Sequence, residues 1–342
     1  MKRIPSKRFE PEVSLKMKDL DYYIKKFAHL HTDTSPKRWS ELTCHRAPHK
    51  PFLLLSILDL FAQKVVNTNL IEITNDLGEL FLLYWSKIMP QGQRGNLALP
   101  FFHLQYEKFW HLVPKKGKEN ILSNLRQMRS IHQLIDLIVG ACLDDELFFL
   151  LQNEKNQNLL RVVLIETYFS PKLRPLLIEQ GKTNIEAYYY SQLLLRQSTK
   201  AEISDKGEIS SEYRTAIRNQ GFRRAVVTAY QHRCAFCGIR MLTPEGRTVV
   251  EAAHIIPWST SHNDNIDNGL SLCRLCHWSF DEGLMSVSEN LAVLISSRLT
   301  FGNNVPGHLQ TLAGRGIVTP FQDEFFPAKE VLKWHRNNVF YK

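Results

Sequence analysis

Four of the six cysteines form two C-x-x-C pairs in the last third of the 342-residue chain: Cys234, Cys237, Cys273 and Cys276. Two such pairs are typical of a closed zinc site, in which four thiolates bind one Zn²⁺ at about 2.3 Å. Four protein ligands leave no position for a water molecule, so the predicted role of this zinc is structural. The alternative is a set of core cysteines without a metal, which this spacing disfavours.

A histidine and an asparagine lie between the two cysteine pairs, and a second histidine follows the second pair. The order is His254, Asn268 and His277, with spacings of 14 and 9 residues that suit two short strands and a helix. This pattern resembles the HNH (ββα-metal) endonuclease family, in its cysteine-containing branch. The resemblance covers residues 221–342, and the ending Trp334-His-Arg-Asn-Asn-Val-Phe340 is similar to the tail of McrA-like members.

The nuclease reaction that this resemblance implies requires residues of these types. Hydrolysis of a phosphodiester needs a base that activates water and a cation that offsets charge on the departing 3′ oxygen. A neutral imidazole can act as this general base near pH 7. We therefore expect His254, at the end of the first strand, to take that role. His277 and Asp281 are four residues apart on the predicted helix and share a face, where they can bind one Mg²⁺ or Mn²⁺. The resemblance implies that Asn268 holds the loop and orients the base.

One position departs from the family pattern. Many members place an Asp or His metal ligand immediately before the base, where this chain has Ala253. Glu251 lies two residues earlier on the same face of the predicted strand, and we expect it to reach the ion directly or through water. The competing hypothesis is that His254 is an ordinary core histidine and that the protein is a zinc-stabilised DNA-binding protein that does not cleave.

Two segments of the N-terminal half combine cations, prolines and aromatic rings. They read His45-Arg46-Ala47-Pro48-His49-Lys50-Pro51, and Leu99-Pro100-Phe101-Phe102-His103-Leu104 followed by Phe109-Trp110. Together they resemble the sulfur-binding domain of nucleases that restrict phosphorothioate-modified DNA. Family members often carry an aromatic residue where this chain has Leu99. The resemblance implies a DNA- and sulfur-binding site made of His45, Arg46, His49, Lys50 and Pro100.

The chemistry of a phosphorothioate agrees with those residue types. Sulfur is larger and more polarizable than oxygen and accepts hydrogen bonds poorly, so a selective pocket is apolar at the sulfur and cationic around the other oxygens. Arg46 and the free N–H groups at the start of the following helix supply the positive part, and the Pro100 ring supplies an apolar wall. We expect His45, His49 and Lys50 to contact phosphates or base edges. The competing interpretation, core packing, is favoured for three aromatic residues: Phe101, Phe102 and Trp110.

The surrounding sequence predicts an α+β protein: a helix-rich N-terminal DNA-recognition domain joined to a C-terminal ββα-metal HNH domain with the four-cysteine zinc site. We place the recognition domain at residues 1–197, a polar linker at 198–212 and the nuclease domain at 213–342. Apolar spacing predicts helices over residues 51–61, 71–85, 121–138, 184–195 and 221–230. Strands are expected over residues 99–105, 109–113 and 159–167.

Charge and composition limit the partners. The formal net charge is +9, and residues 1–200 hold 28 basic and 20 acidic side chains against 15 and 14 in residues 201–342. Such a balance suits a protein that binds the phosphate backbone of double-stranded DNA. No apolar run approaches the roughly 20 residues of a membrane helix, so we expect a cytoplasmic protein with no membrane partner.

The sequence therefore predicts a modification-dependent restriction endonuclease that acts in defence on phosphorothioated DNA. Two alternatives keep the nuclease but have the N-terminal half recognise another mark, such as 5-methylcytosine, or a plain sequence. Because one HNH unit cuts one strand, we expect a homodimer at least on DNA.

Overall fold

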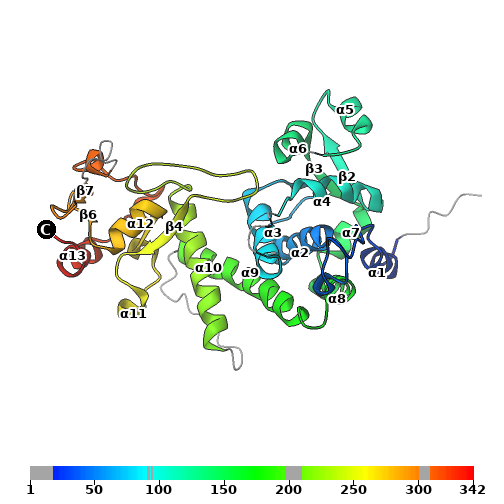
Figure 1. Cartoon of the computed structure of the whole chain (residues 1–342), viewed down its shortest axis with the longest axis horizontal. Helices are drawn as coiled ribbons and strands as arrows, with labels where there is room; N and C mark the ends of the chain where they lie inside the picture. The colour runs from blue at the N-terminus through cyan, green and yellow to red at the C-terminus, as the bar shows by residue number, and fades with distance from the viewer. Residues whose placement is uncertain (1–17, 91–92, 94, 129, 197–209, 300–308) are drawn as a thin grey trace, which may run out of the picture.

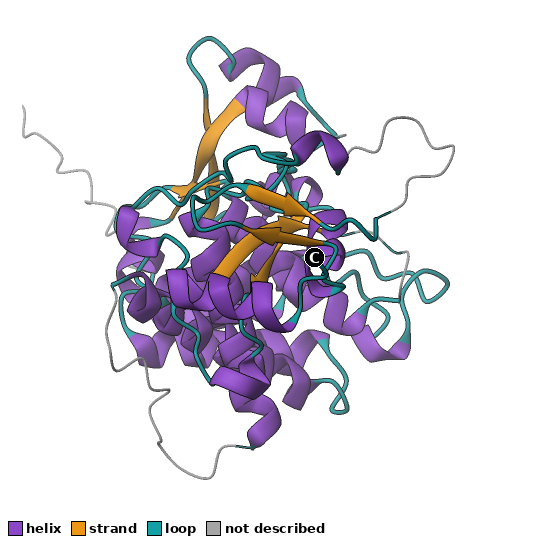
Figure 2. Ribbon diagram, turned by 90° about the vertical axis from the view of Figure 1, so that its left-hand side faces the viewer, coloured by secondary structure: helices purple, strands orange, loops and turns teal. Residues whose placement is uncertain are grey.

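The computed structural model describes residues 18–90, 93, 95–128, 130–196, 210–299 and 309–342. Figure 1 shows an elongated molecule in which the N-terminal elements occupy one end and the C-terminal elements the other, with helices α9 and α10 between them. Helices outnumber strands, and the strands are short, as the view in Figure 2 also shows. The described elements thus form a mixed fold of many helices and small sheets.

The first half contains nine of the described helices and three strands. The helices are α1 (Leu20–Ala28), α2 (His49–Ala62), α3 (Asn75–Ile88), α4 (Ala98–His103), α5 (Glu119–Asn124), α6 (Ile131–Leu137), α7 (Asp145–Leu150), α8 (Glu154–Tyr168) and α9 (Arg174–Leu195). The strands β1 (Ile71–Glu72), β2 (Trp110–Pro114) and β3 (Ile138–Leu143) form an antiparallel sheet in the order β1-β3-β2.

The second half begins with α10 and builds the predicted two strands and a helix. Its helices are α10 (Ser211–Ala229), α11 (Trp258–Ser261), α12 (Arg274–Asp281) and α13 (Lys329–Asn338). The strands β4 (Val250–His254) and β5 (Gly269–Cys273) pair antiparallel, with His254 opposite Gly269, and β6 (Met285–Val287) pairs with β7 (Val293–Ile295). Helix α12 follows β5 directly and packs on both strands of that hairpin.

Helix α2 is the centre of the N-terminal core. Every side chain from Lys50 to Phe61 is buried. Pro51 stands in the first turn, where its missing N–H costs no hydrogen bond. The prediction of a buried helix over residues 51–61 is confirmed. The three aromatic residues for which core packing was favoured are also fully buried: Phe101, Phe102 and Trp110.

Two of the predicted strands are helices. Residues 99–105 form α4 and the start of a 3-10 turn (Leu104–Glu107), because Pro100 fits a first helical turn and the Trp110 indole N–H donates to the Phe101 carbonyl at 2.9 Å. Residues 159–167 lie inside α8, since Leu160 and Leu164 fall on one buried helical face. The strand predicted over residues 109–113 is confirmed as β2.

Two of the predicted helices are right only in part. The helix expected over residues 121–138 is divided into α5 and α6, and its last residue begins β3. The helix expected over residues 71–85 starts later, at Asn75, because Thr74 caps α3 by accepting a hydrogen bond from the Leu77 N–H at 3.2 Å.

Helix α9 belongs to both ends of the molecule. Its Leu177 lies in the N-terminal core, whereas Ala187, Tyr190 and Leu194 lie in the core of the second half. A buried contact fastens it to α2, where Asn184 donates to the Asp59 carboxylate at 2.7 Å. Most of the predicted linker, residues 198–209, lies outside the described residues, and the domain boundaries stay a prediction.

Among the described residues, no helix is long and apolar enough to span a membrane.

Candidate active site

The four predicted zinc ligands come together. Cys234 and Cys237 occupy a turn after α10 that is closed by the Gly238 N–H donating to the Cys234 carbonyl at 2.9 Å. Gly238 has a φ of 73°, which favours glycine. Cys273 ends β5 and Cys276 lies in the first turn of α12. All four sulfur atoms lie within 4.8 Å of one another.

This sulfur cluster fits a zinc ion. Tetrahedral ligands at about 2.3 Å from Zn²⁺ are separated by about 3.8 Å, and the Cys237 and Cys273 sulfur atoms are 3.8 Å apart. Within the described parts of the chain, this is the one group of three or more cysteine, histidine or carboxylate side chains whose ligand atoms all lie within 4.8 Å of one another.

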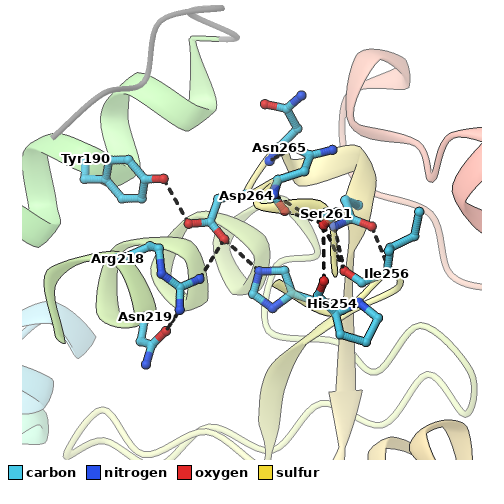
Figure 3. Close-up of polar contacts among 11 residues, drawn as sticks. Tyr190, Arg218, Asn219, His254, Ile256, Ser261, Asp264 and Asn265 are labelled. Carbon is cyan, nitrogen blue, oxygen red and sulfur yellow. Dashed lines mark hydrogen bonds and ion pairs between the residues drawn. The ribbon is translucent and has the colours of Figure 1, made fainter. Parts of the chain in front are cut away.

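His254 stands at the end of β4 and is held on two sides. Its Nε2 lies 2.7 Å from Oδ1 of Asp264, and its ring stacks on Phe222 of α10 at 3.8 Å between centroids. The His254 side chain is 18 % exposed. Figure 3 shows the other ring nitrogen, Nδ1, turned away from Asp264. The carboxylate therefore engages one nitrogen and leaves the second for another partner.

Asp264 is a residue that the sequence analysis did not assign. It is buried, and besides His254 it accepts hydrogen bonds from the Tyr190 hydroxyl at 2.9 Å and the Arg218 guanidinium at 3.2 Å (Figure 3). Arg218 also lies over the Trp258 ring, 3.9 Å from its centroid. Tyr190 lies in α9 and Arg218 in α10, far from Asp264 in the sequence, so local spacing gave no signal for these contacts.

Asn268 holds the loop that follows His254. Its side chain is fully buried, and its Oδ1 accepts from the Ile256 N–H at 2.9 Å. Its amide nitrogen donates to the carbonyl oxygens of Ile256 at 3.1 Å and Asn263 at 2.9 Å. These bonds tie the two ends of the loop that carries Asp264. The positioning role that the resemblance implies for Asn268 stays a prediction.

His277, Asp281 and Glu251 form a second group, on α12 and β4. Asp281 Oδ2 lies 3.4 Å from His277 Nε2, and Glu251 Oε2 lies 3.5 Å from His277 Nδ1. The imidazole and carboxylate donors suit Mg²⁺ or Mn²⁺. The two carboxylates, however, approach opposite nitrogens of one ring. An ion at Nε2 would be shared with Asp281, and Glu251 would instead accept the Nδ1 hydrogen, as the outer carboxylate of many metal-bound histidines does.

The His254–Asp264 pair and the group of His277, Asp281 and Glu251 contact different helices. Strand β4 presents Glu251 to α12 and His254 to α10, as alternation along a strand requires. Among the described residues, no hydrogen bond or ion pair joins His254 to His277 or Asp281. The structure thus brings His277, Asp281 and Glu251 together and places His254 in a separate polar cluster at the end of the same strand.

Part of the predicted N-terminal site lines a cavity. A pocket of about 660 Å³ is lined by three of its residues, His49, Lys50 and Pro100, together with Trp39 and other side chains. Burial lowers the pKa of His49 to about 4, so this imidazole is neutral at pH 7, and its ring lies between Trp39 and Trp85 at 5.4 and 4.7 Å.

Three residues of the predicted DNA- and sulfur-binding site lie in environments other than the expected ones. Lys50 is only 7 % exposed and forms an ion pair with buried Glu107, so its charge is already compensated. His45 and Arg46 do not line the pocket. The Nδ1 of His45 lies 3.0 Å from the Trp39 carbonyl oxygen, and Arg46 lies over the Tyr168 ring, 5.7 Å from its centroid.

Two antiparallel strands, a following helix and a thiolate cluster that clamps their ends define a ββα type of domain. Residues 234–288 match the family model described as HNH endonuclease. This segment is an HNH endonuclease domain, and the prediction of an HNH domain in the C-terminal half is confirmed by the match.

Comparison with whole proteins adds little. One solved structure, a "Modification dependent TagI restriction endonuclease", is 22 % identical over 40 % of this chain and 40 % of that chain, with a TM-score of 0.26. The similarity therefore spans less than half the length of either protein. No curated protein matches the chain.

Proposed function

We propose that the protein is a modification-dependent restriction endonuclease that hydrolyses phosphodiester bonds in double-stranded DNA. The observation that carries the proposal is the position of His254. It lies within the HNH endonuclease segment, bonded to a buried carboxylate, on the same strand as the Glu251 that contacts His277.

In the proposed mechanism, His254 is the general base. Asp264 accepts the Nε2 hydrogen, which keeps Nδ1 unprotonated and able to take a proton from the attacking water. As that proton arrives, the carboxylate stabilises the imidazolium that forms. Asn268 fixes the loop that carries Asp264, so Asp264 and Asn268 are positioning residues.

The second group binds and orients the cation. His277 and Asp281 would hold Mg²⁺ or Mn²⁺, and Glu251 would hold the His277 ring in place. When bound, the divalent ion offsets negative charge on the departing 3′ oxygen. The four cysteines would hold Zn²⁺ and fix the ends of the hairpin and of α12.

We further propose that the N-terminal half recognises phosphorothioated DNA. The supporting observation is that the pocket beside Pro100 has neutral aromatic walls, Trp39 and His49. Arg38 also lines it, 67 % exposed and in an ion pair with Asp33 at 2.9 Å that a phosphate could replace. Uncharged polarizable walls suit sulfur, and a guanidinium suits the phosphate oxygens. Cleavage of both strands would require two copies, so we propose a homodimer on DNA.

A digestion series tests both levels of the proposal. Matched plasmids, phosphorothioated and unmodified, are incubated with the protein and Mg²⁺ or Mn²⁺, with and without chelator. We expect cleavage of the modified plasmid only, abolished by chelator and by His254→Ala. Equal cleavage of both plasmids, or cleavage of a 5-methylcytosine plasmid instead, would remove the sulfur proposal and leave the nuclease. Cleavage by His254→Ala at the parent rate would overturn the mechanism.

A further inference from the structure

A second cavity lies between the two halves of the molecule, next to the candidate catalytic groups. It has a volume of about 500 Å³. Helix α3 forms one wall through side chains such as Leu82, Trp85 and Ser86. The other wall comes from the nuclease half and includes Glu251, the carboxylate that contacts His277. The cavity therefore shares Glu251 with the proposed cation site.

Two close backbone contacts build this cavity. Residues 242–248 form a loop that runs from the nuclease half to α3, as Figure 1 shows in yellow-green. A Cβ on Gly78 would lie 2.3 Å from the Glu245 carbonyl oxygen, and a Cβ on Gly246 would lie 2.3 Å from the Asn75 carbonyl oxygen. Only glycine at both positions allows the loop and the helix to approach this closely.

Ion pairs fasten the same junction. Arg223 of α10 pairs with Glu79 of α3, and Arg224 pairs with Asp76 at 2.7 Å. The α3 wall of the cavity is thus attached to the nuclease half by charge as well as by backbone contact.

Two further arginines line the cavity and are not neutralised by a strong partner. Arg247 is exposed, and its guanidinium has no hydrogen-bond or ion-pair partner among the described residues. Arg274 is 87 % exposed, and its contact with Glu251 is long, at 3.5 Å. Exposed ion pairs of this kind contribute little to stability, so Arg274 can exchange this contact for a phosphate.

We propose that this cavity binds a backbone phosphate of the cleaved DNA strand, adjacent to the scissile position, with Arg247 and Arg274 as the phosphate ligands. The inference rests on the proposed function, because it takes DNA as the substrate. A guanidinium presents paired donors that match phosphate oxygens. Since Glu251 belongs both to the cavity and to the His277 group, the bound phosphate lies close to the one that is cleaved. Because α3 forms the opposite wall, the recognition half takes part in aligning the strand.

Salt dependence of DNA binding tests this proposal without requiring cleavage. Each phosphate contact contributes about 0.9 to the slope of log K against log salt concentration. We would measure binding of a phosphorothioated duplex by fluorescence anisotropy in chelator, over a series of salt concentrations. Because both arginines would bind the same phosphate, the double variant Arg247→Gln/Arg274→Gln should reduce the slope by about one, and each single variant by part of that. Arg315→Gln is the matched control, because Arg315 is an exposed arginine of the same half outside the cavity.

A second variant removes no charge. Gly78→Ala should displace the loop from α3, and Arg247 with it, and reduce the slope as much as Arg247→Gln does. Gly316→Ala is its control, since no atom lies within 4 Å of a Cβ there. A parent-like slope in the double arginine variant, with DNA still bound, would overturn the phosphate site and leave the proposed nuclease intact. Failure of the parent protein to bind any DNA would overturn both.

Discussion

The imidazole of His254 and the carboxylate of Asp264 meet at 2.7 Å across a ten-residue loop, and Asp264 is in turn held by side chains of α9 and α10. The proposed base of the nuclease is therefore oriented by a helix, α9, that also belongs to the N-terminal core.

Replacing Asp264 by asparagine should reduce kcat and leave KM nearly unchanged. The amide can donate to Nε2, which places the ring hydrogen on Nδ1 and blocks the proposed base. General base catalysis contributes about 10²- to 10⁴-fold, so we expect a loss in that range, similar to that of His254→Ala. Steady-state cleavage rates would show it. Tyr190→Phe removes one bond from the same carboxylate and should cost less. An Asp264→Asn enzyme with the parent kcat would exclude the positioning role.

Replacing Cys273 by serine should remove the zinc and unfold the nuclease half. Binding of structural zinc is worth about 10 kcal/mol or more in small zinc domains, which exceeds what a single domain can lose. Metal analysis of the purified protein should find one zinc per chain in the parent and none in the variant. Cys142→Ser, at a cysteine outside the cluster, is the control and should retain the metal. Equal zinc content in both variants would contradict the four-thiolate site.

Glu251 and Asp281 should affect cation binding to different degrees. If Asp281 is a direct ligand and Glu251 holds the His277 ring, Glu251→Gln should weaken Mn²⁺ binding about 10- to 100-fold, and Asp281→Ala should weaken it more. Titration of cleavage with Mn²⁺, together with calorimetry of Mn²⁺ binding, separates affinity from rate. The reverse order of the two effects would identify Glu251 as the direct ligand.

His335 should make stability depend on pH. Its ring is buried, stacks on Phe280 at 3.7 Å and contacts the Ser286 hydroxyl at 2.9 Å, and burial lowers its pKa to about 4. The folded state excludes a proton that the unfolded chain binds below pH 6.5 or so. The contribution of His335 is therefore complete at pH 7 and declines as the pH falls toward 4.

Between pH 7 and pH 5 this loss should be about 2 kcal/mol. Urea unfolding at the two pH values measures it, and the His335→Gln variant corrects for all other groups. If the variant lost as much stability as the parent between these pH values, the buried neutral imidazole would be ruled out as the cause.

The sequence was most informative where function and local spacing coincide. The C-x-x-C pairs predicted the sulfur cluster, and four-residue spacing on α12 predicted that His277 and Asp281 lie together. The sequence was least informative about the secondary structure of α4 and α8, where short apolar runs suit a strand as well as a helix. It could not indicate Asp264, because Tyr190 and Arg218 reach it from distant parts of the chain.

The shared helix α9 also bears on how the nuclease is kept under control. A fragment beginning at residue 213 would contain the cysteines and every proposed catalytic residue, yet it would lack Tyr190 and the apolar side chains of α9 that complete its core. Such a fragment would keep Asp264 without one of its donors. Separation of the proposed nuclease half from the N-terminal half would thus impair the proposed nuclease.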